Sequence, residues 1–343
     1  MSTGIVKDWR YAEHNMGLDH PESPQRIEAI YKMLEKEKAF ASYPLIEPRP
    51  AQEEEIELIH TSSYVKMIKE TSGQERVCLD PDTSTSPRSY EIALLAAGGL
   101  LKAADLIMEG KIQNAFALVR PPGHHAEASQ ARGFCIFNNI AIAAQYLISK
   151  LGLKRILIVD WDLHHGNGTQ HAFDSRSDVL YFSTHQFPHY PGTGFWNEVG
   201  SGDGEGYTVN VPLSPGKTEE DFLYIFQQIL SPIAAAYKPE FILVSAGFDI
   251  FEGDPLGGMS VSAKGFGVLA AELMTLAHTT AKDRLLFTLE GGYNLSGLED
   301  GVRNVLLVLA GQEKISPPQA RISAATEKEL GPVFKVQKKY WPL

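Results

Sequence analysis

Histidines are concentrated in one part of this 343-residue chain, where seven of the eleven lie between residues 124 and 189. Within it, an apolar run at residues 156–159 leads into Asp160, and Asp162 and His164 follow at alternate positions. Alternate side chains of extended backbone point the same way, so Asp162 and His164 can reach one common point. A carboxylate and an imidazole are both zinc ligands, so this strand end predicts two ligands of a metal ion.

A catalytic zinc ion needs about three protein ligands and one open position, so a third ligand should follow another strand. Asp249 is the best candidate, because it comes after an apolar run at residues 241–245 and the small residues Ala246 and Gly247. Asp249 alone would say little, since many strands end in an aspartate. Together with the first two ligands it predicts a three-ligand zinc site.

Two adjacent histidines, His124 and His125, stand in the loop Arg120–Pro–Pro–Gly–His–His, directly after an apolar run. Proline and glycine stiffen this loop, and imidazole titrates near neutral pH, so the pair is suited to moving protons beside a metal. Their protonation would be tuned by acceptors at nearby strand ends, for which Asp160 and Asn167 are the candidates.

A tyrosine follows a further apolar run, in the segment Glu290–Gly291–Gly292–Tyr293. The two glycines permit a tight turn, after which the Tyr293 hydroxyl can point into the site and stabilise a developing oxyanion. A Lewis-acid metal, a proton-transfer pair and an oxyanion donor together are suited to metal-assisted hydrolysis.

The elements that must position these residues are short strands alternating with helices. The strands are almost wholly apolar, as in a parallel sheet buried on both faces. We predict strands at 115–119, 155–159, 179–182, 207–211, 241–245 and 285–289, and helices at 24–38, 88–108, 138–150, 218–237, 263–279 and 297–309. This alternation predicts an α/β fold of three layers, a central parallel sheet flanked by helices.

Composition limits the partners of the chain. The net charge of -11 argues against direct binding of nucleic acid and favours cationic substrates, although solubility alone would also explain it. With only Cys78 and Cys135, no disulfide framework is expected. The chain shows neither a signal-peptide pattern nor a membrane-spanning run, so a cytoplasmic location is predicted.

We expect one catalytic domain over residues 1–311, without internal repeats or linkers. Residues 312–343 are richer in Pro, Lys and Glu and lack a clear period. This C-terminal extension is expected to be partly irregular and to pack on the domain or at an oligomer interface. The sequence leaves the oligomeric state open, with a homo-oligomer among the options.

Seven segments in order give the chain a resemblance to the zinc-dependent histone deacetylase family, closest to its class II and bacterial amidohydrolase branch. They are Asp19–Arg26, Arg120–His125, Gly133–Asn139, Asp160–Thr169, Tyr190–Gly194, Ser245–Asp249 and Glu290–Tyr293. The resemblance implies the arginase/deacetylase fold and hydrolysis of an acyl amide, most plausibly acetyl-lysine in a peptide. It does not cover the sequence beyond about residue 311.

The resemblance also implies roles for individual residues. Asp162, His164 and Asp249 would hold zinc, His125 would be the general base and acid, and His124 its electrostatic partner. Asp160 would bond to His124 and Asn167 to His125, while Tyr293 would donate to the carbonyl oxygen.

Substrate would be held by Gly133, Phe134, Tyr190 and Leu256, and Arg26 would lie in an inner cavity through which acetate leaves. Two structural potassium ions are implied, one near Asp160, Asp162, His164, Ser183 and Thr184, the other near Phe173, Arg176, Val179 and Tyr207.

Two positions depart from common family patterns. Tyr190 stands where a tunnel wall is usually phenylalanine, which adds a hydroxyl group. Asn167 replaces the aspartate of class I members, which leaves His125 without a charged partner and should lower its pKa.

Three alternatives stay open at this point. An acetylpolyamine amidohydrolase would share the same machinery, but it would place an acidic residue where this chain has Leu256. A two-manganese ureohydrolase would share the fold, although the tandem histidines and the Glu290–Tyr293 turn favour a deacetylase. A catalytically silent acyl-lysine-binding protein would usually have lost one of the site residues.

Overall fold

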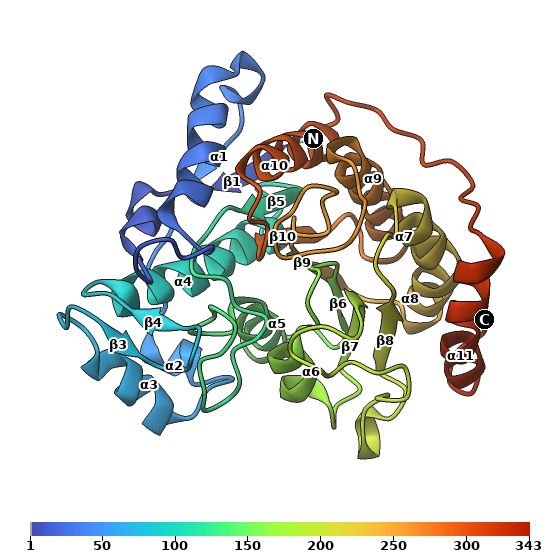
Figure 1. Cartoon of the computed structure of the whole chain (residues 1–343), viewed down its shortest axis with the longest axis horizontal. Helices are drawn as coiled ribbons and strands as arrows, with labels where there is room; N and C mark the ends of the chain where they lie inside the picture. The colour runs from blue at the N-terminus through green and yellow to red at the C-terminus, as the bar shows by residue number, and fades with distance from the viewer. Residues whose placement is uncertain (1) are drawn as a thin grey trace.

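A single eight-stranded sheet forms the centre of the protein, seen in a computed structural model that describes residues 2–343 (Figure 1). The strand order is β2-β1-β5-β10-β9-β6-β7-β8, and every neighbouring pair is parallel. The strands are β1 (Thr3–Val6), β2 (Leu45–Ile46), β5 (Asn114–Ala117), β6 (Ile156–Asp160), β7 (Val179–Gln186), β8 (Thr208–Leu213), β9 (Phe241–Ala246) and β10 (Leu285–Leu289), with a small antiparallel pair of β3 (Val77–Cys78) and β4 (Ser84–Thr85). The predicted central parallel sheet is confirmed.

Helices cover both faces of the sheet, which gives the predicted three layers (Figure 1). One face is covered by α4 (Ser89–Met108), α5 (Asn139–Ser149) and α6 (Asn167–Phe173), and the other by α1 (Pro24–Lys36), α7 (Glu219–Ile225), α8 (Ser231–Tyr237), α9 (Ala263–Thr280) and α10 (Leu295–Leu309). The short helices α2 (Glu53–Ile56) and α3 (Ser62–Glu70) lie outside these layers. Among residues 2–343 no helix combines the length and apolarity needed to cross a bilayer.

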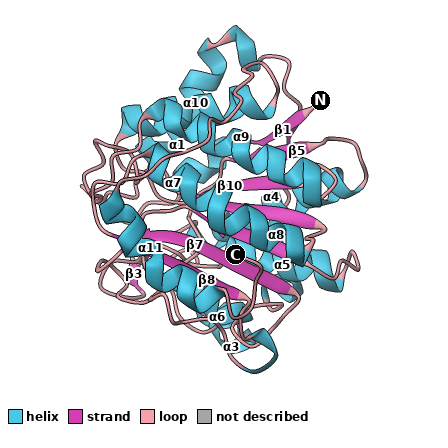
Figure 2. Cartoon of the chain, turned by 90° about the vertical axis from the view of Figure 1, so that its right-hand side faces the viewer, coloured by secondary structure: helices cyan, strands magenta, loops and turns pink. Residues whose placement is uncertain are grey.

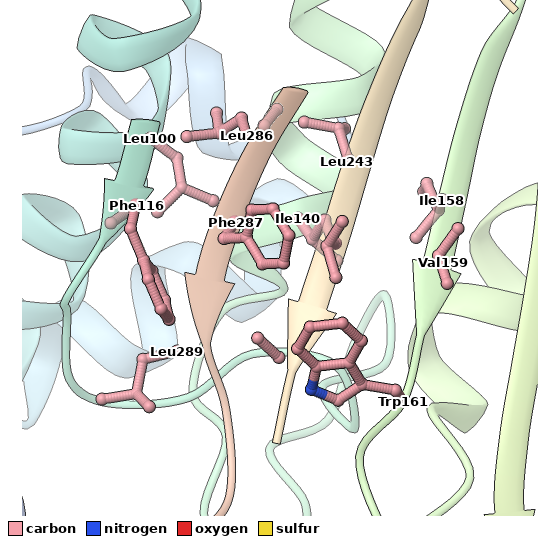
Figure 3. Close-up of a cluster of buried hydrophobic side chains, with 14 of the residues drawn as sticks. Leu100, Phe116, Ile140, Ile158, Val159, Trp161, Leu243, Leu286, Phe287 and Leu289 are labelled. Atoms are coloured by element: carbon pink, nitrogen blue, oxygen red, sulfur yellow. The ribbon is translucent and has the colours of Figure 1, made fainter. Parts of the chain in front are cut away.

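The core explains why the strand sequences are apolar on both faces. Phe116 on β5 and Phe287 on β10 have ring centroids 5.6 Å apart, and Trp161, just after β6, lies 5.5 Å from Phe287 (Figure 3). All three side chains are fully buried. Because helices pack against each face, no strand of this central region has a solvated side on which polar residues could alternate.

The C-terminal segment, which was expected to be partly irregular, has no helix or strand over residues 312–322 and then forms one helix. It contains α11 (Ala324–Gln337), which begins at an N-cap formed by Ser323 and carries Pro332 inside the helix. This helix lies against the edge strand β8 (Figure 2). Glu329 accepts a hydrogen bond from the Ser214 hydroxyl at 3.1 Å and forms an ion pair with Lys217 at 2.7 Å. The helix thus covers a sheet edge that would otherwise expose unpaired backbone groups.

Other differences are smaller. The strands β1 and β2 were not predicted, because runs of four and two residues carry too little pattern. The helix expected over 218–237 is interrupted by a π-helical turn at Phe226–Leu230, which separates α7 from α8. Asp221 accepts a hydrogen bond from the backbone N–H of Thr218 at 2.9 Å, which caps the start of α7.

Candidate active site

Three predicted metal ligands converge at the carboxyl ends of β6 and β9, which are neighbours in the sheet. Asp162 and His164 follow β6, and Asp249 follows β9. His164 Nδ1 lies 3.2 Å from Asp162 Oδ1 and 3.1 Å from Asp249 Oδ2, and one ligand atom from each residue falls within 4.8 Å of the others. All three residues are buried.

Backbone groups orient both carboxylates toward this common point. The N–H of Gly291 donates to Asp162 Oδ2 at 2.8 Å, and the N–H of Leu163 donates to Asp249 Oδ1 at 2.9 Å. A Cβ on Gly291 would lie 2.2 Å from Asp249 Oδ2, so only glycine fits here. Burial and the nearby Asp162 carboxylate raise the pKa of Asp249 to about 7. Two buried carboxylates and an imidazole that meet at one point form a donor set that suits a divalent cation such as zinc.

His124 is held as a charged group beside this ligand set. Its Nδ1 bonds to Asp160 Oδ2 at 3.0 Å, and Tyr181 donates to the same oxygen at 3.0 Å. Burial opposes protonation of His124, but Asp160 and Asp162 outweigh it and raise its pKa to about 10. The Glu290 carboxylate accepts from the N–H of His124 at 3.2 Å, which fixes the backbone of the histidine loop.

His125 is held as a neutral group. Its Nδ1 lies 2.8 Å from Asn167 Oδ1, and its ring centroid is 4.0 Å from that of His124. Burial, followed by the nearby charges of His124 and His164, lowers the pKa of His125 well below its usual value. A neutral imidazole beside a charged one gives the site one proton acceptor and one fixed positive charge.

A pocket of about 390 Å³ opens directly over these groups. Its walls include the four residues that the sequence analysis placed around a substrate, Gly133, Phe134, Tyr190 and Leu256, and the predicted oxyanion donor Tyr293. The Phe134 and Tyr293 rings lie edge to face at 5.9 Å, and the Tyr190 and His125 rings at 5.1 Å. The pocket therefore ends at His164, one of the predicted metal ligands, and at the histidine pair.

The chain is similar to known deacetylases over most of its length. Residues 20–309 match the histone deacetylase domain. A probable deacetylase of Archaeoglobus fulgidus is 40% identical over 299 residues, covering 87% of this chain and 83% of the relative. The chain belongs to the histone deacetylase family. The match of residues 20–309 to this domain and the similarity to the archaeal relative indicate that its activity is that of a deacetylase.

Two further histone deacetylases show how far the likeness extends. Histone deacetylase 15 of Arabidopsis thaliana is 41% identical, over 99% of this chain and 63% of the plant protein. The crystal structure of the HDA15 HD domain superposes with a TM-score of 0.92 at 39% identity, covering 99% of this chain and 95% of that domain. The chain spans about half the length of other plant and fungal histone deacetylases.

Glu290 and Arg26 make contacts that the sequence did not predict, and two residues without a role assigned from the sequence line the pocket. Glu290 was noted only as part of a motif, yet its buried carboxylate also accepts from Gly123 N–H at 2.7 Å. Arg26 is fully buried and donates to the backbone carbonyls of Glu290 and Gly292, at 2.5 and 2.7 Å, so it fixes the turn before Tyr293. Two unassigned polar residues, Asp82 and His189, line the pocket. His189 belongs to the histidine-rich stretch, which was the only signal in the sequence that could have indicated it.

The residues expected around potassium form two separate groups. Asp160 ends β6, and Ser183 and Thr184 lie beside it on β7, so this group shares the carboxyl edge of the sheet with the predicted metal ligands Asp162 and His164. The second group, which contains Phe173, Arg176, Val179 and Tyr207, lies around the starts of β7 and β8. Arg176 N–H donates to the Phe173 carbonyl at 2.9 Å, and Tyr181 N–H donates to the Tyr207 carbonyl at 2.9 Å.

Proposed function

We propose that this deacetylase hydrolyses the acetyl amide of acetyl-lysine to acetate and a free amine, with one zinc ion as cofactor. The observation that supports this most directly is that His124, His125, His164 and Tyr293 line one pocket, and that His164 forms a three-ligand group with Asp162 and Asp249. The relatives named as histone deacetylases support an acyl-lysine side chain of a peptide as the substrate class.

Asp162, His164 and Asp249 would hold the zinc ion. When bound, it would polarise the amide carbonyl and make water a better nucleophile near neutral pH. His125, neutral because of its burial and its charged neighbours, accepts the proton of the attacking water and returns it to the departing amine. The Tyr293 hydroxyl donates to the oxygen that gains negative charge, as an oxyanion donor does.

The charge of His124 supports the assignment of His125, and not His124, as the base. An imidazolium fixed on Asp160 is already protonated at neutral pH, so it cannot act as the base. It instead stabilises negative charge that develops at the reaction centre. Asn167 provides a neutral acceptor for His125 Nδ1, which leaves the basicity of His125 low.

Residues of the pocket walls support two substrate classes to different degrees. Phe134 and Tyr190 would grip the methylene stem of the acyl-lysine, and the Gly133 carbonyl would accept the N–H of the scissile amide. Leu256 lines the pocket where a polyamine-selective enzyme would have an acidic residue, which favours acyl-lysine. Acetylpolyamine is the second candidate, because Asp82 places a carboxylate on the pocket wall that would attract a cationic stem.

We also propose that two structural potassium ions bind, one at the group of residues around Asp160 and one at the group around Phe173. Residues 1–311 would form the catalytic domain and residues 312–343 an extension that packs on it, as the contacts of α11 with β8 support. A reducing, cytoplasmic environment fits Cys78 and Cys135, both of which are free.

Hydrolysis of an acetyl-lysine peptide and of acetylspermidine by the zinc-loaded protein tests this function. We expect the peptide to be hydrolysed faster, with one zinc ion per chain by elemental analysis. Tyr293→Phe should lower kcat by about 100- to 1,000-fold, as loss of one oxyanion donor does elsewhere. His125→Ala should lower kcat by about 100- to 10,000-fold, as loss of a general base does. Near-wild-type turnover in both variants would refute the assignment, and two manganese ions per chain would favour a ureohydrolase.

A further inference from the structure

A hydrogen-bonded chain leads from His125 away from the pocket to the protein surface. His125 Nδ1 bonds to Asn167 Oδ1 at 2.8 Å, and Asn167 Nδ2 donates to Glu127 Oε1 at 2.5 Å. Glu127 in turn accepts a hydrogen bond from His171, whose Nδ1 lies 2.9 and 3.0 Å from the two carboxylate oxygens of Glu127. His125 and Asn167 are buried, the Glu127 side chain is 19% exposed, and the His171 side chain is 50% exposed.

Glu127 determines which way the Asn167 amide faces. An ionised carboxylate can only accept hydrogen bonds, so the group that meets Glu127 Oε1 must be the NH₂ of Asn167. The second hydrogen of that NH₂ points to the backbone carbonyl of His125, at 3.3 Å. The reversed amide would place its oxygen against two acceptors and would lose both hydrogen bonds.

The orientation of Asn167 in turn determines the tautomer of His125. An amide oxygen cannot donate, so His125 Nδ1 must carry the hydrogen that bonds to Asn167 Oδ1. The other nitrogen, Nε2, then keeps its lone pair and is free to accept a proton. With the amide reversed, an N–H would face Nδ1 and favour the tautomer with hydrogen on Nε2, which cannot act as a base.

His171 stabilises Glu127 in the charged form that this arrangement needs. Burial raises the pKa of Glu127, but hydrogen bonds from His171 and Asn167 outweigh it, and the net pKa is lowered. The pKa of His171 is raised, chiefly by the hydrogen bond to Glu127. The two side chains therefore form an ion pair at the surface end of the chain of hydrogen bonds.

We propose that Glu127 is a positioning residue for the reaction, which holds the Asn167 amide so that His125 keeps its base tautomer. Glu127 itself touches neither substrate nor metal ligand in this role. The inference rests on the proposed function of His125 as the base. It explains how a neutral asparagine, which has no intrinsic preference between its two orientations, can serve reliably beside a catalytic histidine.

A matched pair of variants tests the proposal. Glu127→Met keeps the size of the side chain but removes the acceptor, whereas Glu127→Gln keeps an oxygen that can accept from Asn167. We expect Glu127→Met to lower kcat by about 10- to 100-fold with KM little changed, as loss of an outer hydrogen-bonding partner typically does. Glu127→Gln should retain much more of the wild-type kcat. Asp283→Asn, which removes the carboxylate of the remote His278–Asp283 pair, is the control and should leave kcat unchanged.

A double-mutant cycle with Asn167→Asp separates positioning from general structural damage. Both oxygens of a carboxylate accept hydrogen bonds, so in that background no orientation has to be chosen. Adding Glu127→Met to Asn167→Asp should therefore leave kcat unchanged or raise it, because it removes the repulsion between the Glu127 carboxylate and the carboxylate introduced at position 167. Additive losses of kcat in the cycle would overturn the proposal.

A readout that does not depend on activity distinguishes this inference from the proposed function. Nitrogen-15 NMR of histidine-labelled, zinc-loaded protein should show His125 protonated on Nδ1 in the wild type and shifted toward Nε2 in Glu127→Met. A shifted tautomer without any amide hydrolysis by the wild type would support the inference and refute the proposed function. An unchanged tautomer in Glu127→Met would overturn the inference even if kcat falls.

Discussion

Replacing Glu22 by alanine should strongly destabilise the protein, because this carboxylate neutralises two buried guanidinium groups. Its Oε2 accepts from Arg120 Nη2 at 2.7 Å and its Oε1 from Arg26 Nη1 at 3.1 Å, and none of these side chains is exposed. Burial opposes ionisation of Glu22, yet Arg120 lowers its pKa from 4.5 to about 2. At 1.36 kcal/mol for each pKa unit, this fall corresponds to about 3 kcal/mol. Breaking a buried ion pair typically costs about 3–5 kcal/mol, which agrees.

Urea unfolding at pH 7, followed by circular dichroism, measures this loss of stability. The control is Glu35→Ala, which removes an ion pair with Lys7 at 2.7 Å whose glutamate is 52% exposed, and it should cost below about 1 kcal/mol. Because the folded pKa of Glu22 lies below the unfolded value, its contribution is present above pH 4.5 and is lost as the pH falls toward 2. Equal free energies of unfolding for Glu22→Ala and Glu35→Ala would refute the reasoning.

Three further predictions follow from buried and edge contacts. His60 Nε2 accepts from Asn138 N–H at 2.9 Å, and burial lowers the His60 pKa from 6.5 to about 4. As the pH drops from 6.5 toward 4, protonation of His60 in the unfolded chain should therefore lower the free energy of unfolding by up to about 1.4 kcal/mol per pH unit. In His60→Gln, the free energy of unfolding measured in urea should depend less steeply on pH. An equally steep dependence would contradict this. Removing zinc with a chelator should lower the midpoint of thermal unfolding, and adding zinc should restore it; no change would argue against a buried metal site. Glu329→Ala should speed hydrogen exchange of β8 amides, measured by mass spectrometry, while β10 serves as the internal control; unchanged exchange would mean that α11 does not depend on this contact.

The sequence predicted the parts of the site that follow directly from strand ends. Apolar runs mark buried parallel strands, and the residues just after them must meet at one edge of the sheet. That reasoning gave Asp162 and His164 after β6 and Asp249 after β9, and the structure brings all three within 4.8 Å. Their roles as zinc ligands remain predictions for the experiments described above.

The contacts that orient those residues could not be predicted, because they join segments far apart in the sequence. Arg26 and the Glu290 carbonyl are separated by 264 positions, and Arg120 and Glu22 by 98. Periodicity reports which face of an element is buried, but it does not report which other element covers that face. The same limit applies to Glu127, whose effect on His125 depends on a third residue, Asn167, contributed by α6.

The N-terminal segment is part of the catalytic unit and not an addition to it. Arg120, which precedes the histidine loop, donates to the backbone carbonyls of Tyr11 and His14 at 2.8 and 3.0 Å. Both lie before residue 20, where the match to the histone deacetylase domain begins. Leaving this buried guanidinium without those acceptors would impose the cost of unsatisfied charge on the loop that carries the proposed base. We therefore propose that the functional domain begins before residue 20, because contacts that hold the histidine loop in place come from segments that carry no catalytic residue.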